Sequence, residues 1–600
     1  MIKPNRNISV FFLLLVLLTS HAPAQIIPET SRIDWSTAGN RFVFPEAAPE
    51  VSILSFGGVA DGTTNNTAAL NNAMASFGGH PGIVYFPAGS YLFSSMISIP
   101  DSVWLKGAGP DSTYIKIAHS SIGFYFSGTA TNSFTDVISG FQKGSHKITV
   151  ANPALFLAGN YCEIRQDNGS WDIEPATWAT YSVGQIVHID SIIGDTLFLT
   201  EGLHLTFDTS LNLQIQKIIP IKASGMSCMN VERTDNSTAN YGNNFGFNYA
   251  VNCEIRGIES NKSQGSHCII RVSSHISISG CYFHDAFVYD GSSTKGYGVT
   301  ITNHSSLCLV QNNIFNHLRH AMMVKQGANG NVFAYNYSRN PYRNGSMEYP
   351  QDYCGDISLH GHYSFANLFE GNIVQNIIID ETWGPSGPFN TFFRNRAEMY
   401  GIIMASVLTD NQNFVGNEIT GTGYTFPFSW GAYTLTGSAH IQHGNNDNGT
   451  IVPSGTNALI DNSYYLNAGP SYWNVSQSWP DIGIPATLNS GTIPAKERYN
   501  MAEFTDCSQQ GIVTKIPENI AEEFFVYPNP TTGKLFIRLP SEIKSCNIQI
   551  KDLKGKCLIN KKNNLGISGH EIDISSLRPG IYLLFVNTEK YFFTRKIVKL

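Results

Sequence analysis

The sequence predicts an all-β protein built on a right-handed parallel β-helix. Between Cys253 and Asn417, short apolar runs keep returning to asparagine, and the steps from Asn367 to Asn390 and from Asn390 to Asn413 are 23 residues each (390−367 and 413−390). A fixed period of this size indicates stacked copies of one supersecondary unit. The unit consists of strands, because Val, Ile, Phe and Tyr alternate between Gly and Asn turns and no window keeps a 3.6-residue period.

The repeated asparagines and cysteines predict the interior of the coils. A side-chain amide at the same turn of every coil can hydrogen-bond to the copies above and below it. Cys253, Cys281 and Cys308 fall at similar places in successive coils, which favours stacked core cysteines over disulfides. The chain has no CxxC pair, so the cysteines do not indicate a zinc site.

Composition limits the class of protein. The chain has 600 residues, of which 42% are apolar, enough for a sizeable core. The formal net charge is −7, and no basic face of the required size is present, so general nucleic-acid binding is not expected.

The N-terminus predicts export. Lys3 and Arg6 precede the apolar run 10–18, and a small-residue cleavage site follows at Ala22 to Ala24, so residues 1–24 form a signal peptide. Residues 25–50 lead into the solenoid. The apolar run is too short for a membrane span and no later stretch is long enough, so we expect no transmembrane segment in the mature chain.

The entrance to the solenoid has a capping pattern. Residues 66–77 place Leu70, Ala73, Met74 and Phe77 on one helical face, which can cover the open end of the first coil. This segment, with the phrases Phe56-Gly-Gly-Val-Ala-Asp-Gly62 and Gly82-Ile-Val-Tyr-Phe-Pro-Ala-Gly89, resembles the pectate lyase 3 superfamily of rhamnogalacturonase-like and epimerase-like proteins. The family's usual acidic pair is Asn65-Asn66 here. The resemblance covers roughly residues 51–417 and implies a pectin-lyase-like β-helix and a polysaccharide substrate. We expect the β-helix domain to span residues 51–490.

A stretch at about 139–220 interrupts the coil period. Its alternating phrases, such as Tyr161-Cys-Glu-Ile-Arg165, predict a small β-domain inserted between coils. Trp171 and Trp178 in this stretch suit stacking on sugars, or they belong to its core.

The end of the chain predicts a second domain that acts as a sorting signal. After a linker at 491–522, short strands joined by Pro and Gly turns predict a β-sandwich over 523–600. The phrases Val526-Tyr-Pro-Asn-Pro-Thr-Thr-Gly533 and Leu577-Arg-Pro-Gly-Ile-Tyr582 resemble the type A sorting domain of the bacterial type IX secretion system. The resemblance implies the type IX secretion machinery as a partner, and a secreted or cell-surface protein exported through both membranes.

One strand per coil predicts the candidate site. The strands that precede the asparagine segments align so that their fifth residue follows an inward Ile, Val or Leu and therefore points outward. Stacked coils bring these fifth residues into a column of cations, a base and an acid. The column is Arg271, Thr302, Lys325, His360 and Asp380.

Three lengthened loops are expected to wall a cleft around this column, since long loops on a regular scaffold tend to carry function. They are 285–296, 338–355 and 383–388. We therefore take Lys325, His360, Asp380 and Asp356 as catalytic candidates. The substrate-binding candidates are Arg271, Arg343, Tyr353, His362, Glu381, Trp383 and Arg394.

Two chemistries fit these residues. In a lyase acting on a uronic-acid polymer, Lys325 or His360 is the base, and Arg271, Arg343 or Arg394 neutralises the carboxylate. In a glycoside hydrolase, Asp356 pairs with Asp380 or Glu381. The lyase is favoured because the motifs of the polygalacturonases are missing from the sequence.

Other interpretations stay open. Asp356 can cap a turn, and Asp380 can form a structural ion pair with Arg394 or Arg396. Calcium is a possible cofactor, held by Glu348, Asp352 and Asp356, although their spacing matches no loop motif. A non-catalytic polysaccharide-binding protein or adhesin is the alternative to an enzyme, and it predicts a column of Ser, Thr, Asn and aromatic residues instead of ionisable ones.

Overall fold

The protein is described by a computed structural model. It describes residues 26–42, 44–45, 48–236, 242–344, 354–424, 430–458, 460–473, 478–508, 525–527, 529–538, 545–552, 556–564, 570–588 and 592–600. The predicted signal peptide lies outside these residues.

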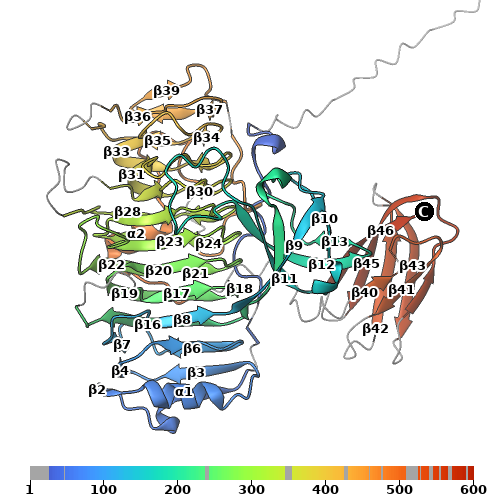
Figure 1. Ribbon diagram of the computed structural model, residues 1–600, viewed down its shortest axis with the longest axis horizontal. Helices are drawn as coiled ribbons and strands as arrows, with labels where there is room; N and C mark the ends of the chain where they lie inside the picture. Colours follow the sequence, from blue (N-terminus) through green and yellow to red (C-terminus); the bar gives the residue numbers. More distant parts are fainter. Residues whose placement is uncertain are drawn as a thin grey trace, which may run out of the picture.

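The main body is a parallel β-helix, as the repeat predicts (Figure 1). Most coils contribute a strand to each of three faces, which we call the first, second and third sheet. The first sheet contains β5 (Ile97–Ser98), β8 (Phe124–Ser127), β17 (Phe245–Asn248), β20 (Ser266–Arg271), β23 (Tyr297–Thr302), β26 (His320–Val324), β29 (Ile357–Leu359), the ends of β31 (Ile373–Ile379) and β33 (Arg396–Met404), and β36 (Tyr433–Thr434).

The other two faces follow in chain order. The second sheet contains β1 (Glu50–Ser52), β3 (Gly82–Phe86), β6 (Val103–Gly107), the starts of β16 (Gly225–Arg233) and β19 (Glu254–Ser263), β21 (Ser277–Ser279), β24 (Leu309–Gln311), β27 (Val332–Ala334), β30 (Leu368–Glu370), β32 (Thr391–Phe393), β34 (Asn413–Val415) and β37 (Ile441–His443). The third sheet contains β2 (Asp61–Asn65), β4 (Gly89–Phe93), β7 (Thr113–Ile117), the ends of β16 and β19, β22 (Tyr282–Ala286), β25 (Ile314–Asn316), β28 (Tyr337–Arg339), the starts of β31 and β33, β35 (Glu418–Ile419) and β38 (Asn445–Asp447).

A few short elements complete the solenoid. β38 pairs with β39 (Thr450–Val452) in antiparallel fashion, and β15 (Ile221–Lys222) pairs with β18 (Ala250–Val251). Four short 3-10 helices are η1 (Glu29–Ser31), η2 (Ile53–Phe56), η3 (Pro153–Leu155) and η4 (Thr209–Leu211). Helix α1 (Thr67–Ala75) covers the open end of the first coil and buries Leu70, Ala73 and Met74, so the capping prediction is confirmed.

The asparagine ladder is present at the turn between the second and third sheets. Each buried amide donates through Nδ2 to the Oδ1 of the next at 2.9–3.1 Å, in the order Asn313, Asn336, Asn372, Asn395, Asn417 and Asn445. A second ladder runs at the preceding turn through Asn331, Asn367 and Asn390. Because the backbone N–H of each residue also donates to its neighbour, the ladders fix the coil register.

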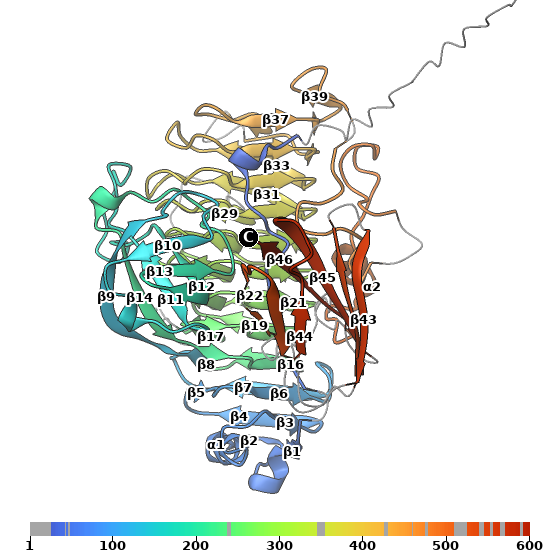
Figure 2. The same cartoon turned by 90° about the vertical axis from the view of Figure 1, so that its right-hand side faces the viewer.

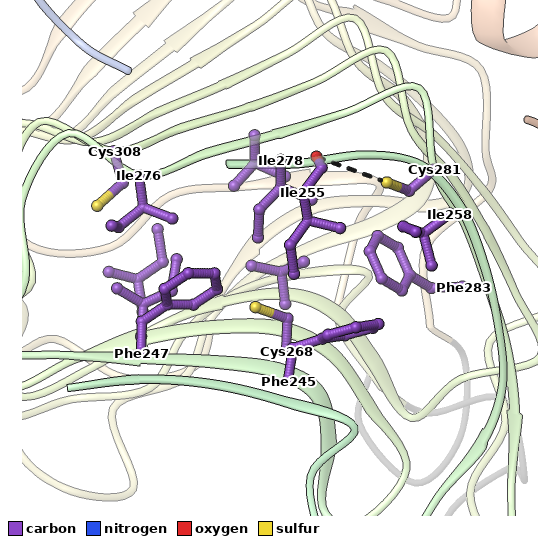
Figure 3. Close-up of a cluster of buried hydrophobic side chains, with 14 of the residues drawn as sticks. Phe245, Phe247, Ile255, Ile258, Cys268, Ile276, Ile278, Cys281, Phe283 and Cys308 are labelled. Carbon is purple, nitrogen blue, oxygen red and sulfur yellow. Dashed lines mark hydrogen bonds between the residues drawn. The ribbon is translucent and has the colours of Figure 1, made fainter. Parts of the chain in front are cut away.

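Stacked side chains fill the interior. Phe333, Phe369, Phe392 and Phe414 form one column of rings with centroids 5.0–5.2 Å apart. Figure 3 shows the core of earlier coils, where Cys281 and Cys308 lie among phenylalanines and isoleucines. Together with Cys253 these thiols are fully buried, and burial raises the pKa of each to about 12. The prediction of core cysteines is confirmed for these three.

The interruption of the repeat is a closed antiparallel barrel inserted between β8 and β15. It contains β9 (Thr129–Ser139), β10 (Lys147–Val150), β11 (Tyr161–Arg165), β12 (Gly184–Ile193), β13 (Thr196–Leu199) and β14 (Gln214–Ile219). It therefore begins at Thr129, earlier than the predicted boundary near residue 139. Figures 1 and 2 show the barrel beside the middle coils.

Buried polar contacts fix the barrel to the solenoid. His304 Nε2 lies 2.9 Å from Glu163 Oε1, and both side chains are almost inaccessible. His204 Nδ1 lies 2.7 Å from Asn329 Oδ1. A buried polar group that loses its partner is costly, so these contacts specify one position of the barrel.

The predicted loose linker is wrong for residues 491–508. Residues 460–473 and 478–508 instead run back along the turn between the second and third sheets, and α2 (Pro494–Met501) is part of this segment. We call residues 460–473 and 478–508 the C-terminal strap. Residues 509–522 of the predicted linker lie outside the described part of the chain.

The C-terminal domain is a sandwich of two antiparallel sheets, as predicted. One sheet contains β40 (Phe525–Tyr527), β41 (Lys534–Arg538) and β44 (His570–Asp573), and the other contains β42 (Ser545–Lys551), β43 (Cys557–Asn564), β45 (Gly580–Thr588) and β46 (Phe592–Lys599). Their inner faces share one apolar core. Within the described residues, no helix has the length and apolar character needed to cross a membrane.

Candidate active site

The predicted column stands in register at the C-terminal ends of the first-sheet strands. Arg271 pairs with Thr302. Further along, Val324 faces Ile301 and Leu359, and Leu359 faces Ile379, so the residue that follows each of them continues the same line. These following residues are Thr302, Lys325, His360 and Asp380. Because neighbouring parallel strands are about 4.8 Å apart, the column brings residues distant in sequence into contact range.

His360 and Asp380 form a hydrogen-bonded pair. His360 Nδ1 lies 2.5 Å from Asp380 Oδ2, and the two side chains are 14% and 22% exposed. The other carboxylate oxygen accepts hydrogen bonds from the backbone N–H and the hydroxyl of Thr382 at 3.0 and 2.6 Å. Burial alone would raise the pKa of Asp380, but His360 and Thr382 together hold it below its usual value. Asp380 is therefore ionised at neutral pH and orients the imidazole.

Lys325 is a base in this column whose pKa is lowered toward neutrality. Burial, followed by the charges of Arg271 and Arg319, lowers the pKa of Lys325 from 10.5 to about 8. At pH 7 roughly a tenth of such an amine is uncharged and able to accept a proton. Lys325 is thus a partly buried amine next to an aspartate-bound imidazole.

The inserted barrel supplies an aromatic surface over Lys325. The Trp178 ring centre lies 5.3 Å from Lys325 Nζ, and Trp178 is 44% exposed. Its backbone carbonyl accepts from Gln326 Nε2 at 2.5 Å, and its ring packs against Trp383 with centroids 5.3 Å apart. Exposed indole rings suit the apolar faces of sugars. Trp171 instead stacks on Tyr363 beside the barrel core, so its core interpretation fits better.

Four predicted site residues are buried in the structure, namely Arg394, Asp356, His362 and Glu381. Arg394 donates to the carbonyls of Ile482 and Ile484 at 2.8 Å, on the far side of the coil, so its predicted role in substrate binding is wrong. Asp356 is fully buried, accepts from Gln375 N at 2.7 Å, and lies four residues before His360, about 13 Å along a strand. Its predicted place beside Asp380 is therefore wrong as well.

His362 is the third buried residue. It has no exposed surface, and burial lowers its pKa to about 4, which keeps it neutral. Its ring supports Trp178 at 4.7 Å between centroids, so it positions the tryptophan rather than contacting a substrate. Glu381 is also buried, and neither of its carboxylate oxygens has a hydrogen-bond partner within the described residues.

Two of the three predicted loops join the first sheet at its other edge. Loop 285–296 and the described ends of loop 338–355, residues 338–344 and 354–355, precede strands β23 and β29, whereas the column follows these strands, about 17 Å away. Arg343 accordingly lies over Gly291 and not in the column, which corrects its predicted position. Tyr353 lies outside the described residues. The turn at 383–388 and the barrel are the parts that border Lys325 and His360.

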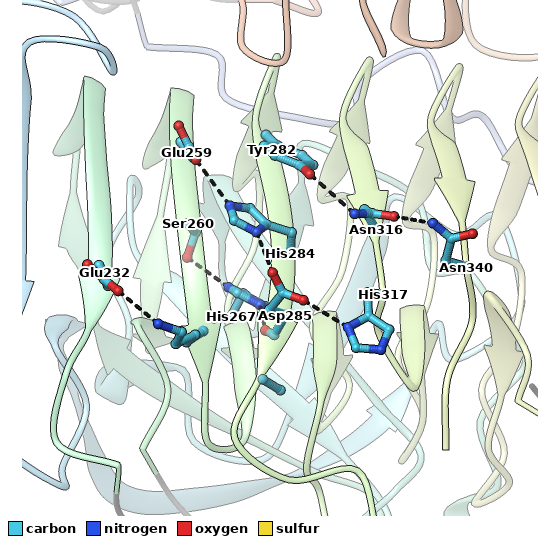
Figure 4. Close-up of polar contacts among 12 residues, drawn as sticks. Glu232, Glu259, Ser260, His267, Tyr282, His284, Asp285, Asn316, His317 and Asn340 are labelled. Carbon is cyan, nitrogen blue, oxygen red and sulfur yellow. Dashed lines mark hydrogen bonds and ion pairs between the residues drawn. The ribbon is translucent and has the colours of Figure 1, made fainter. Parts of the chain in front are cut away.

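The other edge carries a second group of titratable residues that the sequence analysis did not identify (Figure 4). His284 bridges Glu259 and Asp285 at 3.1 and 2.9 Å, and Asp285 Oδ1 lies 2.8 Å from His317 Nδ1. His284 and His317 lower the pKa of Asp285 to about 2. A strand alignment for the third sheet would have found this cluster, since Asp285 lies near the end of β22 and His317 follows β25 of that sheet.

A protein metal site needs several ligand side chains that converge on one point. No group of three His, Cys, Asp or Glu side chains converges in the described part of the chain. Asp356 is turned toward the backbone of Gln375, while Glu348 and Asp352, the other predicted calcium ligands, lie outside the described residues.

Two family models match the chain. Residues 50–163 match the model described as "Rhamnogalacturonase A/epimerase, pectate lyase-like", and residues 525–600 match the "Secretion system C-terminal sorting domain". Both predicted resemblances are confirmed. The sorting domain indicates export to the cell surface or secretion. No curated protein sequence matches the chain.

Solved structures with similarity to this chain include two phage tailspikes and an epimerase module. The tailspike gp49 from Pseudomonas phage LKA1 is 16% identical over 61% of this chain and 64% of that chain, with a TM-score of 0.47. The Gp54 tailspike of Acinetobacter baumannii bacteriophage AP22 is 13% identical over 62% of this chain and 66% of that chain, with a TM-score of 0.40. The Azotobacter vinelandii mannuronan C-5 epimerase AlgE6 A-module is 14% identical over 66% of this chain and 98% of that chain, with a TM-score of 0.30. The chain spans less than two thirds of either tailspike.

Proposed function

We propose that this protein is an exported enzyme that cleaves an acidic, uronic-acid-containing polysaccharide by β-elimination at the Lys325, His360 and Asp380 column. The observation that carries the proposal is Lys325, an amine with a pKa of about 8 in register with Arg271 and with the His360–Asp380 pair. The pectate lyase-like family match supports a polysaccharide substrate. The sorting domain supports export toward extracellular polymers.

The reaction needs a base, a proton donor and a cation, and the column offers one of each. Uncharged Lys325 removes the proton on the carbon beside the substrate carboxylate, and the released electron pair forms the new double bond as the glycosidic C–O bond breaks. His360, held by Asp380, gives its proton to the leaving oxygen. Arg271 offsets the carboxylate charge, and Trp178 and Trp383 receive the sugar rings.

The spacing of the column favours this division of work. Lys325 and His360 are on adjacent strands, so base and proton donor face neighbouring atoms of one sugar ring at a separation of about 4.8 Å. A glycoside hydrolase would need a protonated carboxyl opposite a second carboxylate. Asp380 is held ionised by His360, and buried Asp356 does not reach it, which makes the hydrolase the weaker proposal.

The test is to incubate the exported protein with pectic, alginate-like and neutral polysaccharides. A lyase produces unsaturated uronic ends, seen by ultraviolet absorbance, in equal number to new reducing ends. Reducing ends without that absorbance would replace the lyase with a hydrolase. Binding without either product would instead support a polysaccharide-binding protein.

The pH dependence of the reaction tests the role of Arg271. Its positive charge lowers the pKa of Lys325, so Arg271→Gln should raise that pKa above about 8. The uncharged amine then forms at higher pH, and the rise in kcat/KM should move upward by about half a pH unit or more. Arg256→Gln, which removes an arginine from the second sheet, is the control. An unchanged pH profile in Arg271→Gln would contradict the assignment of Lys325 as the base.

A further inference from the structure

The turn between the second and third sheets uses one left-handed residue in each of nine successive coils, from β16 to β37. Strand register aligns these positions, since Ser227 and Met229 pair with Arg256 and Ile258 on either side of the turn. The aligned residues, all with φ between 53° and 67°, are Cys228, Gly257, Gly280, Asn312, Tyr335, Gly371, Arg394, Gly416 and Gly444. Glycine adopts this conformation freely, whereas other residues pay a steric cost.

Three of the four non-glycine residues at this position use their side chains to hold the C-terminal strap. Arg394 donates to strap carbonyls, including that of Asp461 at 3.0 Å. Tyr335 accepts at its hydroxyl from Trp479 Nε1 at 3.1 Å. Asn312 Oδ1 accepts from Arg498 at 2.6 Å. The side chain at each of these positions therefore fastens the strap.

Cys228 is the fourth, and it meets the end of the strap. Cys507 lies directly over Gly257, the residue opposite Cys228, because a Cβ built on Gly257 would lie 2.9 Å from both the Cα and the Sγ of Cys507. The Cys507 thiol donates to Gly257 O at 3.7 Å, which places it next to the coil position opposite Cys228. Asp506 N also donates to Gly280 O at 2.7 Å, which fixes the backbone next to Cys507.

We propose that Cys228 and Cys507 form a disulfide in the exported protein. Cys228 and Gly257 are on adjacent parallel strands, which are about 4.8 Å apart, and Cys507 lies directly over Gly257. Disulfide-bonded residues usually have Cα atoms about 4.4–6.8 Å apart, so Cys507 is placed within the range from which the bond can form. The match to a secretion sorting domain brings the chain through compartments where disulfides form.

The chemistry is thiol–disulfide exchange with a protein oxidant of the export compartment in its disulfide form. The neighbouring thiol of Cys507 favours the thiolate of Cys228 and lowers its pKa. This thiolate attacks the oxidant and forms a mixed disulfide. Cys507, once deprotonated, attacks Sγ of Cys228 and releases the oxidant as a dithiol, so the two cysteines lose two protons and two electrons to it.

Other described cysteines provide contrasts within the same chain. Cys253, Cys281 and Cys308 face the solenoid core, where burial keeps their thiols protonated. Cys557 is exposed on β43 of the sorting domain. Cys557 is therefore the matched control, because it is an accessible thiol that we do not expect to bond to Cys228.

The experiment maps thiols in the exported full-length protein. The protein is alkylated without reductant, unfolded, digested and analysed by mass spectrometry. The expected major form is a peptide cross-linked between Cys228 and Cys507, two hydrogens lighter than the separate peptides, which disappears on reduction. Recovery of both cysteines mainly as alkylated thiols would overturn the proposal, as would a link from Cys228 to any other cysteine.

Thermal unfolding gives an independent measurement. Reductant should lower the unfolding midpoint of the native protein by several degrees, whereas Cys507→Ser should start at the lower midpoint and not respond to reductant. Cys557→Ser should respond as the native protein does. Equal midpoints with and without reductant in the native protein would show that the strap is not cross-linked. The peptide map needs no variant, so it remains decisive if Cys507→Ser folds poorly.

Discussion

Replacing Lys325 with methionine should lower kcat/KM on an acidic polysaccharide by about a thousandfold, since a positioned general base contributes about 10²–10⁴ to the rate. Methionine keeps an unbranched side chain beneath Trp178 but cannot accept a proton. The measurement is the initial rate of unsaturated-end formation. His360→Ala should reduce the rate as well, because the leaving oxygen then lacks its proton donor.

The chain offers a matched control for His360. His317 is also an imidazole bound by an aspartate, Asp285, but it lies at the opposite edge of the first sheet. His317→Ala should leave the rate within about twofold of the native value. If His317→Ala lost activity while Lys325→Met and His360→Ala kept it, the active site would belong at the other edge.

The same Lys325 substitution should stabilise the protein below pH 8. Folding lowers the pKa of Lys325 from 10.5 to about 8, so the folded state disfavours the charged form. This cost is fully present below the folded pKa and fades as pH rises toward the unfolded value. At pH 6–7, Lys325→Met should therefore raise the free energy of unfolding, by at most about 3 kcal/mol. Lost activity together with gained stability would separate a functional role from a structural one.

The second large effect is expected in the asparagine ladder. Asn372 donates to Phe333 O and Asn395 Oδ1, and its own Oδ1 accepts from the backbone and the side chain of Asn336. Asn372→Ala leaves these buried groups unpaired, at about 1–3 kcal/mol each. The free energy of unfolding should fall by about 4 kcal/mol or more, measured by denaturant titration.

The control for the ladder is an asparagine outside it. Asn340 is exposed, donates to Asn316 Oδ1 at 2.8 Å and has a φ of 53°, so Asn340→Gly, which keeps this backbone conformation, should cost less than about 1 kcal/mol. Similar losses for Asn340→Gly and Asn372→Ala would mean that the ladder does not stabilise the coils.

Much of the fold could be predicted because the repeat is local in each coil. The recurring asparagine fixes one turn, and the alternation of the strand then fixes which residues point outward. This placed Lys325, His360 and Asp380 in one column without any knowledge of long-range contacts. Asp356 was misplaced because it precedes its strand whereas His360 follows it. Two such residues can lie on the same face of the sheet and still be far apart along the strand.

The remaining errors involve contacts between distant parts of the chain. Arg394 looks like a surface cation in its own coil, but the carbonyls it binds come from residues 460–484, which carry no repeat. The contact of Trp178 with Lys325 also joins distant parts of the chain, since only the position of the barrel places Trp178 over Lys325. No periodic pattern records either contact.

The strap has a consequence for how the solenoid unfolds. In a stack held only by nearest neighbours, the terminal coils can peel away one at a time. Gly483 of the strap contacts the coil of Gly416, and Cys507 of the strap contacts the coil of Gly257. The strap therefore connects these two coils across the coils between them. Unfolding of the C-terminal coils would also have to break the contacts between the strap and the coils that it crosses. We therefore expect these coils to unfold together in one cooperative transition.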